Sequence, residues 1–332
     1  MAPKLHEIDP NGDTLLILRN PNAPFAVPAP PPGPPQKRAK THQSADSKPE
    51  VHMRLSSKHL ALASEYFQKL MVGGWKETTT TAEGQYSYTI QTEDFDEEAL
   101  LIVMNIIHGK TTNLPRSVNL KRLAKISLLV DYYRCHEAVQ FFSQTWLKSL
   151  GKTASKSRDH LLELSVSWVS ANADAFRNSS MSLIKSSVKP IDSLGLPIPQ
   201  NIIDVLNARR EAHISAILAG FERLVKEQYP KKYIACSFAC SSMALGALIK
   251  QLVKTGLHHP SPLPPYAGHS ILTLNDAICD LGKLPFDKFC PRGAVGEMIC
   301  DASIKPYHIL DKEIKKIKGL EISDFMIIDQ PK

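Results

Sequence analysis

The stretch Val51–Glu77 (VHMRLSSKHLALASEYFQKLMVGGWKE) changes its hydrophobic period within a few residues, and this change constrains the fold more than any other feature. Up to Leu55, apolar residues occupy every second position, the alternation that buries one face of a β-strand. Over Leu60–Met71 they recur every three or four positions, which predicts an amphipathic helix that ends at Gly73-Gly74. The stretch therefore predicts a strand followed closely by a helix.

The same patterns predict further elements on either side. Strands are expected over Asp13–Leu18 (DTLLIL) and Gln85–Thr92 (QYSYTIQT), which are rich in β-branched, aliphatic and aromatic residues. A helix is expected after Asp94, a favourable N-cap with Glu97 three residues later, and Gly109 is placed as its stop. A second helical stripe before Gly151 comprises Leu123, Ile126, Val130, Tyr133, Ala138, Phe141, Phe142 and Trp146.

Residues 20–50 form a proline-rich insert between two predicted strands. Eight of the residues 21–35 are proline, whose fixed φ and missing amide donor exclude both helix and β-ladder. We therefore expect a disordered surface loop within the first hairpin. Its basic residues Lys37, Arg38 and Lys40 fit either a nuclear-import signal or a simply solvated linker, and the sequence leaves both open.

The predicted elements occur in the order of a known module. The segments that carry the likeness are DTLLIL from Asp13, LALASEYFQKLM over residues 60–71, FDEEALLIVMNIIHG from Phe95 and LAKISLLVDYYRCHEAV from Leu123. They resemble the BTB/POZ domain, and their sequence is most similar to that of a BTB family abundant in filamentous fungi. The resemblance implies an α+β fold, a small sheet capped by helices, and a role in protein–protein interaction without catalysis. Ser56-Ser57 stands where many animal BTB domains carry a His-Arg pair.

At 332 residues, the chain is long enough for about two domains. Beyond the BTB-like part, we expect a mainly α-helical C-terminal region. The predicted parts are residues 1–19 with the first strand, the insert at 20–50, the main part of the BTB/POZ domain at 51–151, and a helical domain at 157–332. Within the last part, helices are predicted over residues 157–187, 199–229, 236–255, 270–281 and 309–318.

Composition narrows the partners and the compartment. The apolar runs are too short to span a bilayer, the N-terminus is too polar for a secretory signal, and six irregularly spaced cysteines do not suggest a disulfide framework. We therefore expect a cytoplasmic or nuclear protein. The net charge of +7 comes from 40 basic and 33 acidic residues, an excess too mild to favour nucleic acid as the partner. A nuclear, nucleic-acid-associated regulator remains the second alternative function.

The sequence contains no phosphate-binding loop, dinucleotide turn, nucleophile elbow or zinc-protease helix, so we expect neither an enzyme nor a cofactor. His136-Glu137 lacks the second histidine that such a zinc helix requires, and we interpret this histidine as structural. The acidic residues at the predicted helix start are explained by capping and the helix dipole. They are Asp94, Asp96, Glu97 and Glu98.

The cysteines leave a zinc site open. Cys236 and Cys240 are four residues apart in a predicted helix, so they share a face and could supply two thiolates. Cys290 and Cys300 could complete the site, although Cys279 competes for that role. The alternative is that these cysteines are buried as small apolar residues.

Trp75 and Glu77 are the candidate partner-interface residues. The resemblance implies this role, because some BTB proteins contact the cullin-3 ubiquitin-ligase scaffold through a hydrophobic-x-Glu motif just after the corresponding helix. Trp-Lys-Glu stands in the similar place here. Alternatively, the tryptophan folds back onto the helix and the carboxylate is solvated. The expected partner is a protein, either a second copy of the chain or cullin-3, with a substrate bound by the helical region in the latter case.

Overall fold

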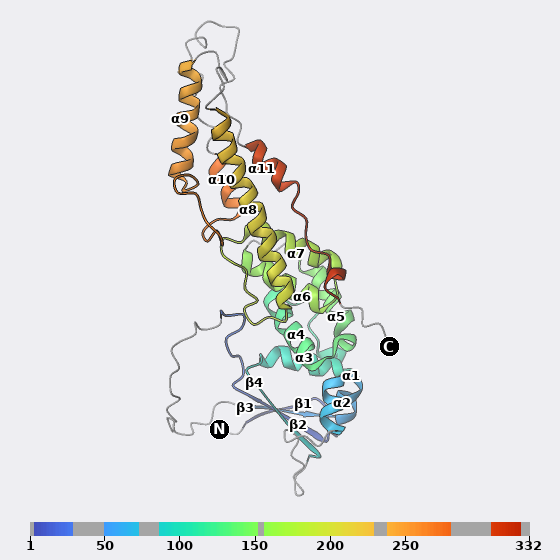
Figure 1. Ribbon diagram of the computed structural model, residues 1–332. Coiled ribbons are helices and arrows are strands. Elements are labelled where there is room, and N and C mark those ends of the chain that lie inside the picture. The colour runs from blue at the N-terminus through green and yellow to red at the C-terminus, as the bar shows by residue number, and fades with distance from the viewer. Residues whose placement is uncertain are drawn as a thin grey trace, which may run out of the picture. The chain divides into compact units, whose positions relative to one another are not determined.

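The computed structural model describes residues 3–28, 50–72, 86–151, 156–228, 238–279 and 307–326. The chain divides into two compact units (Figure 1). Unit 1 comprises Met1–Phe176, Asp192–Pro199 and Ile322–Lys332, and unit 2 comprises Arg177–Ile191 and Gln200–Glu321.

The described part of unit 1 contains a mixed four-stranded sheet with the strand order β1-β3-β2-β4. Its strands are β1 (Lys4–Glu7), β2 (Thr14–Arg19), β3 (Glu50–Leu55) and β4 (Tyr88–Glu93). β3 is antiparallel to β2, as expected for the first hairpin, whereas β1 is parallel to β3 and β4 is parallel to β2. The three predicted strands are confirmed. β1 was not predicted from the sequence, because its residues KLHE are mostly polar and exposed.

The alternation predicted for β2 and β3 places one face of the sheet in the core. Leu16 and Leu18 of β2 are fully buried, as are Met53 and Leu55 of β3. The register sets Leu16 opposite Met53, so the buried side chains of the two strands lie next to each other. The strand half of the opening sequence pattern is therefore confirmed.

Helices complete unit 1, and α3 lies directly above the sheet in the view of Figure 1. They are α1 (Ser57–Ala63), α2 (Glu65–Val72), α3 (Glu97–Ile107), α4 (Leu120–Tyr133), α5 (His136–Ser149), α6 (Ser157–Val169) and the first residues of α7 (Ala173–Ser186), with short 3₁₀ turns at Thr111–Asn113 and Ile322–Asp324. α3 buries seven of its eleven residues and packs against α1, α4 and α5. The prediction that Phe141 belongs to the buried stripe of α5 is wrong, because this side chain is 73% exposed.

The single helix predicted over Leu60–Met71 is wrong, because α1 and α2 meet at a break at Ser64. Ser64 has extended backbone angles, φ −149° and ψ 119°. Its hydroxyl donates a hydrogen bond to the carbonyl of Tyr133 and accepts one from the amide of Phe67 at 3.1 Å. The acceptor at the end of α4 is brought near by the tertiary fold, so the local hydrophobic pattern does not reveal the break.

The predicted N-cap of α3 lies two residues too early. Asp96, not Asp94, caps the helix, and its carboxylate accepts the amide N–H of Ala99 at 3.0 Å. Asp94 instead adopts a left-handed φ of +67° and accepts a hydrogen bond from the side-chain amide of Asn20. The predicted stop is confirmed, since Gly109 follows the C-cap with a φ of +67°.

The first residues of the predicted disordered insert are ordered. The amide of Asn22 donates to the carbonyl of Phe95 at 2.9 Å, and the guanidinium of Arg158 donates to the carbonyl of Phe25 at 3.1 Å. The expectation of disorder is therefore wrong for residues 20–28, which pack against the body of unit 1. Outside the described residues lie 29–49, including Lys37, Arg38 and Lys40.

The described part of unit 2 is helical, which confirms the predicted fold class. Its elements are the rest of α7, α8 (Gln200–Gln228), α9 (Phe238–Lys254), α10 (Ile271–Cys279) and α11 (Tyr307–Ile314). The long helix predicted over residues 157–187 is divided into α6 and α7, because Ala171 has a left-handed φ of +52°. Among the described residues, no helix has both the length and the apolar character needed to cross a bilayer.

A fully buried arginine holds unit 2 together. Arg210 on α8 has no exposed surface. Its Nε donates to the carbonyl of Ser187 at 2.7 Å and its Nη1 to that of Pro265 at 2.8 Å. Its Nη2 donates to the carbonyls of Tyr266 at 3.0 Å and His269 at 2.8 Å. One side chain thus fixes the end of α7 and the loop before α10 to α8.

Candidate protein-interaction surface

The helix pair α1–α2 carries the most exposed large apolar side chains described in unit 1. Leu62 is 89% exposed and Val72 is 85% exposed, whereas Leu60 and Phe67 on the same two helices are fully buried. Single exposed aliphatic residues are common, but two on adjoining short helices offer contact area to a partner. The exposed residues of this pair define what we call the α1–α2 surface: Lys58, His59, Leu62, Glu65, Gln68, Lys69 and Val72.

A cluster of aromatic side chains packs α2 against the end of α4. The ring of Phe67 stacks on that of Tyr133 at 4.7 Å between centroids, and Tyr66 lies 5.5 Å from both Tyr132 and Tyr133. The Tyr133 hydroxyl donates to Thr92 on β4 at 3.1 Å. Burial raises the pKa of Tyr133 well above its usual range, so this donor stays protonated. α2 is therefore anchored to both the sheet and α4.

Asp13 fixes the start of α1. Its carboxylate accepts the backbone amide of Ser57 at 2.8 Å and the hydroxyl of Ser57 at 2.6 Å. Burial acts to raise the pKa of Asp13, but the hydrogen bonds from Ser57 outweigh it and hold the pKa below its usual value. Ser57 thus ties the start of α1 to Asp13, the residue just before β2. The sequence shows both residues, but only the fold shows that they meet.

His108 provides a second anchor for α1. Its Nδ1 donates to the carbonyl of Met104 at 2.8 Å, so its Nε2 can accept the amide of Ser56 at 3.0 Å. This arrangement requires the neutral imidazole. Burial lowers the pKa of His108, and the bond to Met104 opposes this only in part. The ring also stacks on His59 of α1 at 5.1 Å between centroids.

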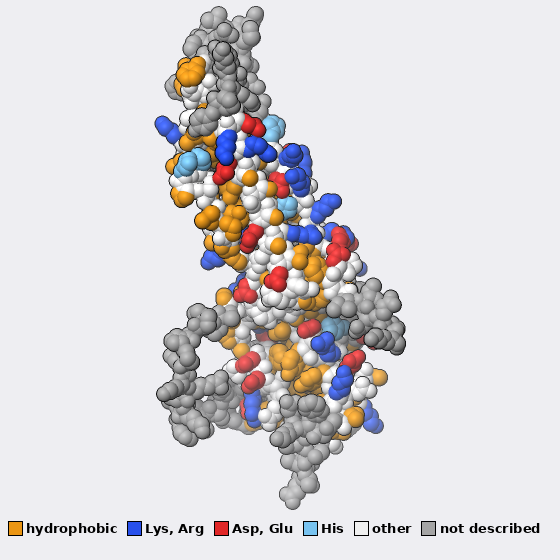
Figure 2. Space-filling model, in the orientation of Figure 1, with side chains coloured by type: hydrophobic (Ala, Val, Ile, Leu, Met, Phe, Trp, Pro, Cys, Tyr) orange, Lys and Arg blue, Asp and Glu red, His pale blue; other side chains and the backbone are white. Residues whose placement is uncertain are grey.

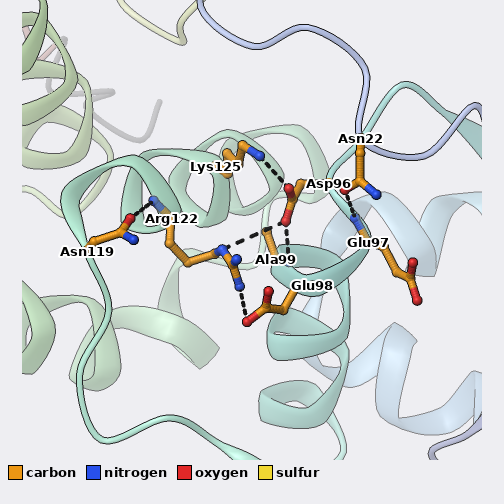
Figure 3. Close-up of polar contacts among 8 residues, drawn as sticks. All are labelled: Asn22, Asp96, Glu97, Glu98, Ala99, Asn119, Arg122 and Lys125. Carbon is orange, nitrogen blue, oxygen red and sulfur yellow. Dashed lines mark hydrogen bonds and ion pairs between the residues drawn. The ribbon is translucent and has the colours of Figure 1, made fainter.

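The acidic residues at the start of α3 form a structural network (Figure 3). Asp96 accepts hydrogen bonds from the amide of Ala99 and from Lys125, and Glu98 forms an ion pair with Arg122. Burial acts to raise the pKa of Asp96, but the bonds from Lys125 and Ala99 hold the pKa below its usual value. These contacts fasten α3 to α4, in agreement with the structural interpretation of this cluster.

Asparagines complete the same network. Asn22 accepts the backbone amide of Glu97 at 3.2 Å, and Asn119 caps α4 by accepting the amide of Arg122 at 2.8 Å (Figure 3). The Glu97 carboxylate in turn binds Lys4 at 2.7 Å and His6 at 3.0 Å, which secures the edge strand β1. All of these carboxylates have structural partners, so the cluster offers no free pair for acid–base chemistry.

His136 and Glu137 line a cleft of about 600 Å³ in unit 1, together with Ser143 and Trp168. His136 lies 3.9 Å from the Asp131 carboxylate, and burial lowers the pKa of the imidazole. Ser143 is seven residues further along α5, roughly 10 Å along the helix axis. The histidine therefore cannot activate this serine as a nucleophile, and its position fits the structural interpretation.

The remaining candidate residues lie outside the described part of the chain. Trp75 and Glu77 follow α2 three and five residues after Val72. Three of the cysteines considered as zinc ligands also lie outside the described residues: Cys236, Cys290 and Cys300. Cys240 lies in α9 and Cys279 in α10, and the structure describes the backbone of these two residues but not their side chains. Within the described residues, no group of three or more His, Cys, Asp or Glu could hold a metal ion.

Comparison with known families identifies the module to which this surface belongs. Residues 47–150 match the family model of the BTB/POZ domain. The match begins just before β3 and ends after α5, and it includes the whole α1–α2 surface. A search of curated proteins found no match to the chain. The likeness to BTB proteins of filamentous fungi stays a prediction.

Proposed function

Because residues 47–150 are a BTB/POZ domain, a protein–protein interaction module, we propose that the protein is a non-catalytic scaffold or adaptor that binds a partner through the α1–α2 surface. The observation that carries the proposal is the pair Leu62 and Val72, exposed on helices whose inner faces are firmly anchored. Burying one such side chain at an interface contributes about 1.5–3 kcal/mol. The two together therefore supply roughly 3 kcal/mol or more, enough for interface anchors.

The first test is self-association through this surface. Size-exclusion chromatography of the full chain, coupled to light scattering, measures the molar mass of the particle across a series of protein concentrations. If the chain dimerises, Leu62→Asp with Val72→Asp is expected to weaken the dimer by roughly 100-fold, the equivalent of about 3 kcal/mol. Phe141→Asp is the matched control, since it changes an equally apolar and 73% exposed residue of unit 1 outside the surface.

If the chain is monomeric at every concentration, the partner expected at this surface is a different protein. Affinity purification with the wild-type chain and with the Leu62→Asp, Val72→Asp variant then identifies proteins that depend on the surface. The proposal fails if the variant keeps both its oligomeric state and every partner of the wild-type chain.

A second candidate function is that of a cullin-3 substrate adaptor, with Trp75 and Glu77 as the proposed contacts. It is supported by the Trp-Lys-Glu sequence that follows α2 after Gly73-Gly74, and by the 85% exposure of Val72 at the end of that helix. Purified cullin-3 is expected to retain the wild-type chain in a pull-down and to lose the Trp75→Ala, Glu77→Ala variant. Equal retention of both would remove these two residues from the proposal.

A further inference from the structure

The helices α8 and α11 of unit 2 approach closely at a glycine. A Cβ on Gly220 would lie 2.5 Å from the Cγ2 of Ile309, closer than side chains tolerate, so glycine permits this crossing. A groove of about 520 Å³ runs along the crossing. Its apolar floor comprises Ala216, Ala219, Gly220, Leu224 and Ile309.

Two cationic side chains line this α8–α11 groove, one from each helix. Arg223 projects from α8 and Lys312 from α11, and both are exposed. Neither side chain forms an ion pair or hydrogen bond with any other residue that the structure describes. Figure 2 shows further Lys and Arg side chains gathered over α8 and α11 on the face in view, with acidic side chains among them.

The buried acid of the groove is already neutralised. The Glu313 carboxylate binds His213 at 2.8 Å and Lys316 at 2.7 Å, and only 12% of its side chain is exposed. Glu227 is the other carboxylate among the lining residues. Arg223 and Lys312 therefore outnumber the free carboxylate, so an anionic ligand would find two cations, one from each helix, beside the apolar floor.

We propose that the α8–α11 groove binds an acidic peptide segment of a partner protein. Carboxylates of the peptide pair with Arg223 and Lys312, and an apolar side chain of the peptide covers the floor at Ala219 and Leu224. A protein segment fits better than single-stranded nucleic acid, because the described lining contains no Phe, Tyr or Trp on which bases could stack. This binding site is on unit 2 and does not depend on the α1–α2 surface.

Fluorescence anisotropy on the full chain tests the proposal. The probe is a short labelled peptide in which Asp and Glu flank a central Leu-Phe pair. The comparison peptide has Asn and Gln in place of the acids, and labelled oligothymidine of similar charge is the nucleic-acid probe. The acidic peptide is expected to bind at least about tenfold more tightly than either, and added salt should weaken it.

Matched variants locate the binding. Arg223→Glu with Lys312→Glu is expected to weaken peptide binding at least about tenfold. Lys254→Glu makes the same kind of charge change at an exposed position of α9 and should leave binding within about twofold of wild type. Ala219→Trp fills the floor without a charge change and should also weaken binding, which keeps the test open if the charge reversals disturb folding.

Several results would overturn the proposal. These are no binding of the acidic peptide, equal binding of the Asn/Gln peptide, or losses for Lys254→Glu as large as those for the groove variants. Tighter binding of oligothymidine that depends on Arg223 and Lys312 would identify a nucleic-acid surface instead. The Leu62→Asp, Val72→Asp variant should bind the acidic peptide normally, so failure here and failure of the proposed function are distinguishable.

Discussion

The buried guanidinium of Arg210 is expected to dominate the stability of unit 2. A hydrogen bond from a charged donor contributes about 1.5–3 kcal/mol, so the four bonds of Arg210 total roughly 6–12 kcal/mol before the cost of burial. Removing the cation from water costs several kcal/mol. Arg210→Met avoids that cost but leaves four buried carbonyls without their donor. We expect a net loss of about 3–5 kcal/mol in the free energy of unfolding.

Denaturant unfolding of the full chain, followed by far-ultraviolet circular dichroism, measures this loss. Hydrogen exchange read by mass spectrometry should place the lost protection in the end of α7 and the loop before α10, which contain the four acceptors. Arg209→Met is the matched control, because Arg209 is the neighbouring residue of α8 and makes a single long bond of 3.4 Å to the carbonyl of Gly319. Its expected cost is below about 1 kcal/mol.

Arg210→Lys separates the role of charge from the role of geometry. Lysine keeps the positive charge but lacks the planar fork that reaches four acceptors, so we expect it to rescue little of the stability. Full rescue by lysine, or a loss for Arg210→Met no larger than that for Arg209→Met, would refute the assignment of this side chain as the main link within unit 2.

The remaining predictions concern single groups. Burial lowers the pKa of His108 in the folded state, so the neutral imidazole contributes stability that is fully present above the unfolded pKa of about 6.5. This stability is lost as the pH falls toward the folded pKa. In His108→Gln, the denaturation midpoint should therefore fall less between neutral and mildly acidic pH. Ser165→Ala should raise the unfolding free energy by about 1 kcal/mol, since the buried Ser165 hydroxyl has no hydrogen-bond partner among the described residues. Ser64→Ala should lower it by about 1–2 kcal/mol, because the hydroxyl both donates to α4 and caps α2. One equivalent of zinc in the purified chain, lost in Cys236→Ser and Cys240→Ser variants, would support the metal site, and metal-free protein would remove it.

The elements that the sequence predicts well are those whose signal is local. The alternation in β2 and β3 and the stop at Gly109 depend on neighbouring residues, and both are confirmed. Asp94 and Asp96 illustrate the limit, because both are good caps by type. The choice between them is made by Asn20 and Lys125, which bind one aspartate each from distant parts of the chain. No local pattern carries that information.

The burial of Arg210 could have been predicted from the hydrophobic pattern of the sequence. Leu206, Arg210 and Ile214 are spaced four residues apart on α8, so the arginine interrupts an otherwise apolar stripe, and the residues on either side of it are fully buried. A charged residue at such a position predicts either a break in the packing or a buried side chain with several partners. The four carbonyls that bind it could not be predicted, because they come from chain segments on both sides of α8 in the sequence.

The anchoring contacts of α1–α2 bear directly on how this surface would bind. The start of α1 is held by Asp13 and His108, and the start of α2 by Ser64, so the helices that carry Leu62 and Val72 are fixed before a partner arrives. Association then requires little ordering of the backbone, and more of the free energy from burying the two side chains remains as affinity. Weakening an anchor should therefore reduce affinity even though the anchor touches no partner. In Ser64→Ala, a partner that binds through this surface should lose affinity, whereas a ligand of the α8–α11 groove should not.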